Sequence, residues 1–112
     1  MEGSYELGEE VRGDALLVRL SGKLDGTSGN DVVEALEKAG LGKLVLDLSG
    51  VEYMSSSGLS IILKLKTVCD LRLLALPAAV REILELAGVV PLLRLFDQES
   101  AALEAAAEEP AG

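Results

Sequence analysis

The sequence predicts a single α/β domain with a mostly parallel, mixed sheet of about five strands and about four helices. Its length of 112 residues is enough for one hydrophobic core and too short for two. Hydrophobic residues make up 49% of the chain but aromatic residues only 3%, so the core must consist of Leu, Val, Ile and Ala. Apolar runs of strand length alternate with segments of helical spacing, which indicates parallel strands joined by helices.

Five short segments have the pattern of strands. The first alternates loosely and is expected to pair antiparallel with the second, because the turn Arg12-Gly13-Asp14 joins them. The next three are short apolar runs bounded by turn residues, a pattern typical of strands buried on both faces. The predicted strands cover residues 5–11, 15–20, 43–48, 71–76 and 92–96.

Four segments have apolar residues at helical spacing. The first follows the N-cap candidates Ser28 and Asn30, and the third lies between Pro77 and the stop signal Gly88. The last is rich in Ala and Glu, and we expect it to pack weakly on the sheet with Leu103 as its main anchor. The predicted helices cover residues 32–39, 59–68, 80–87 and 98–108.

Composition excludes several classes of function. The formal net charge of −9 opposes direct binding to nucleic acid or to an anionic membrane surface. Without histidine, the usual catalytic triads and mixed metal sites cannot form, and the single Cys69 is expected to be a small apolar residue. The acidic N-terminus does not read as a secretory signal. We therefore expect a cytoplasmic protein, a monomer or weak dimer, with no cofactor and no metal.

The most informative stretch is the loop between the third strand and the second helix, where three serines precede a glycine. One serine suffices as an N-cap, so Ser55, Ser56 and Ser57 exceed what capping requires, and Gly58 lets another backbone come close. This pattern favours a docking or modification loop. An enzyme is not expected because no histidine can activate a serine, although a Ser–Lys pair formed by tertiary structure stays open.

Four segments follow one another in an order typical of a known family. They read GKLD at 22–25, LVLDLS at 44–49, YMSSSGL at 53–59 and VREILELAG at 80–88. From about residue 5 to 103 the chain resembles the STAS domain of bacterial anti-sigma factor antagonists. The resemblance implies one STAS domain over residues 1–112, with its core at about 5–103 and an acidic Ala/Glu-rich tail at 104–112.

The resemblance also implies a partner and a switch. Members of the family bind an anti-sigma factor, itself a serine kinase of the histidine-kinase-like ATPase type, and thereby release a sigma factor. The kinase phosphorylates a loop serine and switches binding off. Matched residue by residue, the acceptor is Ser56, and Ser55 stands where the family usually has Asp. Asp25, Ser55, Ser57 and Gly58 are expected at the partner-binding surface, with Asp25 close to the serine loop.

A second reading stays open within the same fold. The chain could be a constitutive STAS subunit of a lipid-transport or stress-signalling complex. The first reading predicts a kinase partner and reversible binding, whereas the second predicts a permanent complex. A neighbouring gene for a histidine-kinase-like ATPase would favour the first.

Overall fold

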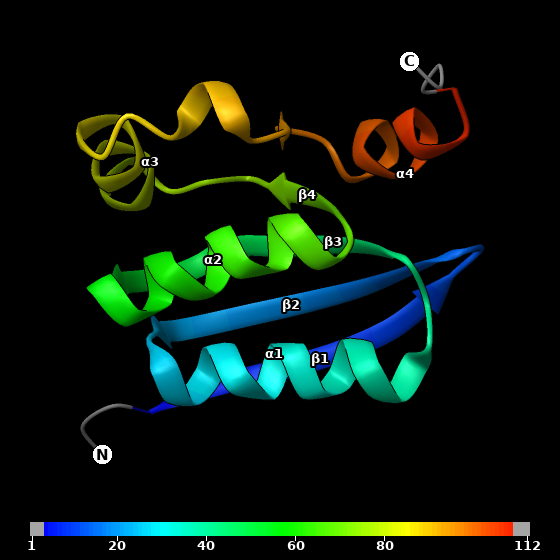
Figure 1. Cartoon of the computed structure of the whole chain (residues 1–112), viewed down its shortest axis with the longest axis horizontal. Helices are drawn as coiled ribbons and strands as arrows, with labels where there is room; N and C mark the ends of the chain where they lie inside the picture. Colours follow the sequence, from blue (N-terminus) through cyan, green and yellow to red (C-terminus); the bar gives the residue numbers. More distant parts are fainter. Residues whose placement is uncertain (1–3, 109–112) are drawn as a thin grey trace.

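A computed structural model describes residues 4–108 (Figure 1). The strands are β1 (Tyr5–Arg12), β2 (Ala15–Leu24), β3 (Lys43–Met54), β4 (Asp70–Leu74) and β5 (Leu95–Phe96). The helices are α1 (Gly26–Ala39), α2 (Ser56–Val68), α3 (Ala78–Leu86) and α4 (Glu99–Glu108), with a short 3-10 helix at Val90–Leu92. The end of the predicted tail, residues 109–112, lies outside the described residues.

The strands form one sheet in the order β1-β2-β3-β4-β5. β1 pairs antiparallel with β2, and the other neighbours pair in parallel. The connection between β1 and β2 is tight because Gly13 adopts a φ of 61°, a conformation that glycine accepts without strain. The predicted fold class and the antiparallel first strand are confirmed.

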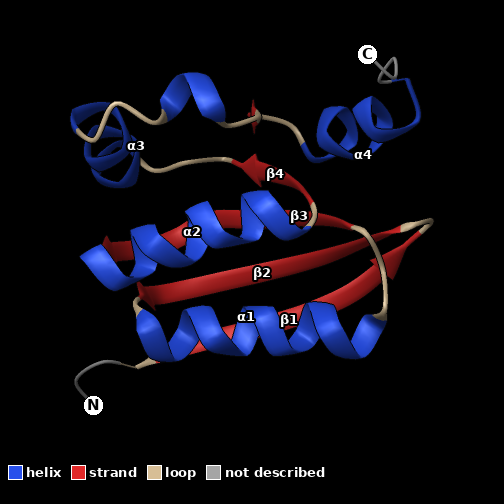
Figure 2. Ribbon diagram, in the orientation of Figure 1, coloured by secondary structure: helices blue, strands red, loops and turns tan. Residues whose placement is uncertain are grey.

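The sheet has a thickly covered front face and a sparsely covered rear face. α1 and α2 lie side by side in front of the strands (Figure 2), and α3 contacts β3 on the same side of the core. The front core is aliphatic, as the composition predicts, and includes Leu20, Leu46, Ile62, Leu73 and Leu84. On the rear face α4 covers a smaller cluster: Ala15, Leu17, Val45, Leu74 and Ala102.

β2 and β3 both continue past the ends predicted for them. They reach Leu24 and Met54, whose side chains are buried in the front core. Register shifts between Arg19 and Ser21, and between Gly22 and Lys23, interrupt the pairing and let the strands bend and continue. The sequence prediction followed continuous apolar runs, which end before these bulges, so it missed the extensions.

The last two strands are shorter than predicted. β4 ends at Leu74 because Ala75 has a positive φ of 59°, which takes the backbone out of the extended region. The segment predicted as a strand at 92–96 begins instead in the 3-10 helix Val90–Leu92, which contains Pro91. Only Leu95 and Phe96 pair with β4.

α4 is held to the rear face by a buried arginine. The Arg72 side chain is 0% exposed, its Nη1 donates to the Ala102 carbonyl at 3.0 Å, and its Nη2 donates to Asp70 Oδ2 at 2.7 Å. Ala102 is fully buried, whereas Leu103 is only partly buried. Leu103 also packs against the rear cluster, so the anchoring predicted mainly for Leu103 is shared with Ala102 and with the Arg72 hydrogen bond.

The start of α4 is held by two more arginines. Glu99 accepts hydrogen bonds from Arg12 Nη1 and from Arg19 Nη2, each at 2.8 Å. Arg19 also contacts Glu10 at 3.4 Å, and these carboxylates raise the pKa of its guanidinium. The helix is thus docked by polar contacts at one end and by the Ala102 contact in its middle, more firmly than its composition indicated.

Candidate functional site

The carboxyl ends of β2 and β3 meet at one edge of the sheet, where α1 and α2 begin (Figure 1, left). The Ser55 N–H donates to the Leu24 carbonyl at 3.0 Å, so the serine loop is fastened to the end of β2. A Cβ placed on Gly26 would lie 3.6 Å from the Ser57 Cβ. The predicted closeness of Asp25 to the loop is confirmed.

Asp25 is the N-cap of α1. Its Oδ1 accepts hydrogen bonds from the backbone N–H groups of Thr27 and Ser28, each at 3.1 Å. The Ser28 hydroxyl in turn accepts from the Asp25 N–H at 3.0 Å, which completes a capping box. Ser28 and Asn30, predicted as caps, lie inside the helix, so that prediction is wrong. The Asp-x-x-Ser spacing was the signal that could have shown the true start.

Ser55 is the N-cap of α2, so this helix begins earlier than predicted. Its hydroxyl accepts from the Gly58 N–H at 3.1 Å, and its carbonyl accepts from the Leu59 N–H at 3.0 Å. Serine and aspartate are equally good N-caps. Ser55 can therefore cap the helix as well as the Asp that the family usually has at this position. Ser56 and Ser57 follow in the first turn, and both side chains are exposed.

Gly58 lies where the two strand ends and the helix converge. A Cβ on Gly58 would lie 2.3 Å from the Leu24 carbonyl oxygen and 3.0 Å from the Leu24 Cγ. A second close approach occurs between the helices, where a Cβ on Gly29 would lie 2.7 Å from Ile61 Cγ1. The absence of side chains at these two glycines brings α1, α2 and β2 close together and sets the position of the serine loop.

Sequence reasoning did not single out Tyr53 and Lys23 as site residues. They lie opposite each other at the ends of β3 and β2, two residues before Ser55 and Asp25 respectively. Lys23 Nζ is 5.6 Å from the centroid of the Tyr53 ring and 3.9 Å from Asp25 Oδ2. The signal in the sequence was a rare aromatic residue directly before the serine loop.

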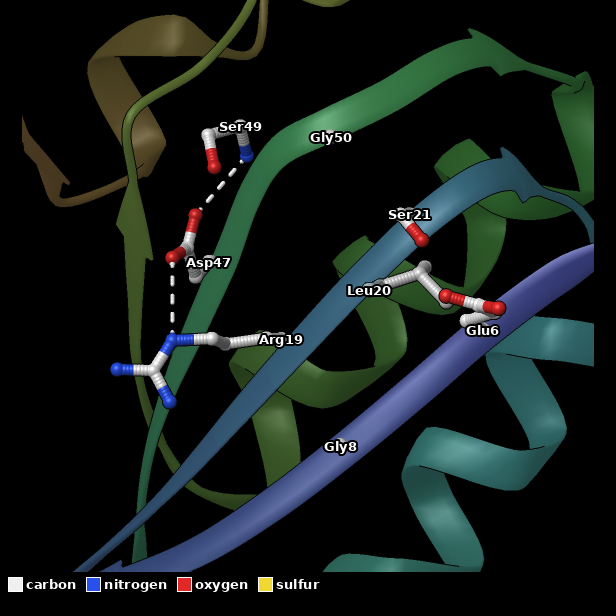
Figure 3. Close-up of a pocket in the computed structure, with 8 residues that line it drawn as sticks. All are labelled: Glu6, Gly8, Arg19, Leu20, Ser21, Asp47, Ser49 and Gly50. Carbon is white, nitrogen blue, oxygen red and sulfur yellow. Dashed lines mark hydrogen bonds and ion pairs between the residues drawn. The ribbon is translucent and has the colours of Figure 1, made fainter.

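A shallow hollow of about 310 Å³ lies on the rear face of the sheet (Figure 3). Arg19 reaches across it, its Nε 3.7 Å from Asp47 Oδ2, while Asp47 Oδ1 accepts from the Ser49 N–H at 2.9 Å. These groups serve the bulge in β3 and the docking of α4. The lining residues are Glu6, Gly8, Arg19, Leu20, Ser21, Asp47, Ser49 and Gly50.

Within residues 4–108, no group of three or more His, Cys, Asp or Glu residues is placed to hold a metal ion. Over the same residues, no helix is both long enough and apolar enough to cross a membrane.

A mixed sheet with capped helices that begin at the carboxyl ends of its parallel strands is an open α/β architecture, in which ligands and partners generally bind at that edge. The sequence pattern of the STAS domain matches residues 9–102, and the chain belongs to the STAS domain family.

Individual relatives are regulators of sigma factor control. An anti-sigma F factor antagonist from Paenibacillus polymyxa is 33% identical over 109 residues, which cover 85% of this chain and 88% of the relative. The crystal structure of an anti-sigma factor antagonist from Mycobacterium paratuberculosis superposes with a TM-score of 0.79 at 24% identity, covering 94% of this chain and 96% of the other. The anti-sigma factor antagonist SpoIIAA in its unphosphorylated form gives 0.73 at 20% identity, covering 96% and 100%.

Proposed function

We propose that this chain is an anti-sigma factor antagonist, which binds an anti-sigma factor with serine kinase activity and thereby frees a sigma factor. Phosphorylation of Ser56 switches the binding off. The name of the Paenibacillus polymyxa relative, 33% identical over most of both chains, supports the antagonist role. The single observation that carries the switch is the position of Ser56, which is exposed in the first turn of α2 while its neighbour Ser55 makes the cap.

The chemistry of the switch is phosphoryl transfer from ATP. The Ser56 Oγ forms a bond to the γ-phosphorus, the bond from that phosphorus to the leaving ADP breaks, and the hydroxyl proton passes to a base of the kinase. The catalytic groups belong to the partner, and the chain itself supplies an accessible acceptor. This role requires no cofactor, and it fits a single domain acting as a monomer or weak dimer in the cytoplasm.

The effect of the phosphate is electrostatic. A phosphoserine carries about −1.5 to −2 charges, which the positive end of the α2 dipole tolerates. The first turn reads Ser-Ser-Gly-Leu, so the new charge meets no acidic side chain within that turn. At a contact with a partner, the same charge must lose its water, and it repels any acidic group opposite. The fold therefore persists while binding is lost.

The test is a binding titration with an anti-sigma factor of the histidine-kinase-like ATPase type, taken from the same genome. We expect binding that weakens when ATP is added, together with phosphate on Ser56. Ser56→Ala should still bind but should no longer respond to ATP, because it loses only a hydroxyl. Ser60→Ala is the matched control, since Ser60 is exposed one turn further along α2.

An affinity that ATP does not change, with no phosphate on Ser56, would overturn the switch. The constitutive subunit of a lipid-transport or stress-signalling complex would then be the better reading. The two adjacent serines should also differ in their effect on stability. Ser55→Ala should lower the free energy of unfolding by about 1 kcal/mol because it removes the cap, whereas Ser56→Ala should leave it almost unchanged.

A further inference from the structure

Tyr53 is unusual in this chain because it is a large aromatic residue left in solvent. The sequence contains two Tyr, one Phe and no Trp, so aromatic rings are scarce even in the core. Tyr53 is nevertheless 52% exposed, at the end of β3 and directly before the serine loop. Tyrosine is among the residues most enriched at the centres of protein interfaces.

The ring is also held in place from one side. Lys23, its partner in the parallel register, lies 5.6 Å from the ring centroid, a distance at which a cation attracts the face of an aromatic ring. Lys23 is itself oriented by Asp25, whose Oδ2 lies 3.9 Å from its ammonium nitrogen. The other carboxylate oxygen, Oδ1, caps α1. Asp25 therefore connects the start of α1 to the Tyr53 ring through Lys23.

Such an arrangement lowers the cost of burying the ring against another protein. A free tyrosine side chain loses rotamer freedom when it binds, whereas a ring already restrained has less to lose. Leu24 and Met54, the residues next to Lys23 and Tyr53, point into the front core. Lys23 and Tyr53 do not belong to that core: Tyr53 is exposed and Lys23 is half-buried, so the ring and its lysine lie at the same carboxyl edge of the sheet as the serine loop.

We infer that Tyr53 is an anchor residue for the anti-sigma factor, with Lys23 and Asp25 as positioning residues that hold its ring. The inference rests on the proposed function and adds a contact that it does not contain. The ring requires an apolar cavity on the partner. A basic rim around that cavity would complement the net charge of −9 and the exposed Glu52, which precedes Tyr53 in the sequence.

The experiment measures the dissociation constant for the same ATPase in the absence of ATP, which keeps Ser56 unmodified. Tyr53→Ala should raise the constant about thirtyfold, as expected for an interface anchor, and Tyr53→Phe should stay close to wild type. Val11→Ala is the matched control, because Val11 is an apolar side chain 61% exposed near the β1–β2 turn at the opposite end of the sheet.

The positioning role needs its own variants. Lys23→Met should raise the dissociation constant about threefold through loss of the cation–π contact, and Lys23→Arg should restore it. Wild-type affinity in Tyr53→Ala would overturn the inference while the proposed function stands. An equal loss in Lys23→Met and Lys23→Arg would overturn the positioning role. If the wild-type chain does not bind the ATPase at all, the proposed function fails first.

Discussion

Gly58 offers the most direct test of how the site is built, and the perturbation is Gly58→Ala. The added methyl group would lie 2.3 Å from the Leu24 carbonyl oxygen, whereas ordinary contacts begin near 3.4 Å. Either the end of β2 or the start of α2 must then move by roughly 1 Å. Both are backbone, and Ser55 is hydrogen-bonded to the same Leu24 carbonyl, so no flexible side-chain end can give way.

Two opposing effects set the magnitude. Overpacking against fixed backbone costs about 3 kcal/mol, at the upper end of the usual range. Alanine in place of a helical glycine returns about 1 kcal/mol, because glycine loses more backbone freedom on folding. The net loss in the free energy of unfolding is about 2 kcal/mol. With a urea dependence of about 1.5 kcal/mol/M for a domain of this size, the unfolding midpoint falls by about 1.3 M.

The assay is urea unfolding followed by circular dichroism, with Gly42→Ala as the matched control. A Cβ on Gly42 meets nothing within 4 Å, so that variant should unfold at or slightly above the wild-type midpoint. A Gly58→Ala midpoint equal to that of Gly42→Ala would refute the close approach as the determinant of loop position. A lower midpoint with a changed slope would instead indicate a change in the denatured state.

Two further predictions concern other parts of the molecule. Arg72→Met leaves the buried Ala102 carbonyl without its donor, while Asp70 keeps its contact with Arg94 at 3.1 Å. The free energy of unfolding should therefore fall by about 2 kcal/mol, and the backbone amides of α4 should exchange hydrogen faster. Unchanged hydrogen exchange in α4 would contradict the anchoring role of Arg72. Burial, and to a smaller extent the charge of Asp70, raises the pKa of the Cys69 thiol to about 11. At pH 8 only about 0.1% of the thiol is then thiolate, so its labelling by a thiol-reactive reagent should be slow. The labelling rate should rise about tenfold per pH unit up to pH 10. A labelling rate at pH 8 like that of an exposed cysteine would contradict it.

Periodicity was sufficient for the order of elements but not for their ends. Apolar runs identified β2, β3 and β4 because the first part of each strand, at 15–18, 44–46 and 71–74, is buried on both faces. The extensions to Leu24 and Met54 depend on bulges, which shift the side-chain pattern and are set by pairing with the neighbouring strand. Local sequence does not contain that pairing.

The rear face illustrates a different limit. Arg72 lies within an apolar run, and nothing in the neighbouring sequence distinguishes it from an ordinary exposed arginine. Its complete burial depends on Asp70 two residues earlier and on the Ala102 carbonyl thirty residues later. Asp70 accepts from Nε and Nη2 whether or not α4 is in place, but Nη1 gains its acceptor, the Ala102 carbonyl, only once α4 is docked, and a buried donor without a partner is costly. The firm attachment of α4 therefore could not be predicted from its Ala/Glu composition.

The three adjacent serines differ in what the fold requires of them, and this difference decides which can carry a reversible modification. Ser55 is half-buried and its hydroxyl accepts the Gly58 N–H at 3.1 Å, so a phosphate on this oxygen would disturb the cap of α2. Ser56 and Ser57 are exposed beyond the cap, where added charge meets the positive end of the helix. Ser55 caps α2 and Gly58 packs against β2, so neither role depends on the Ser56 side chain. The charge at Ser56 can therefore change while the backbone stays in place. A switch at this position would then act on the partner contact, and the fold would be the same in both states.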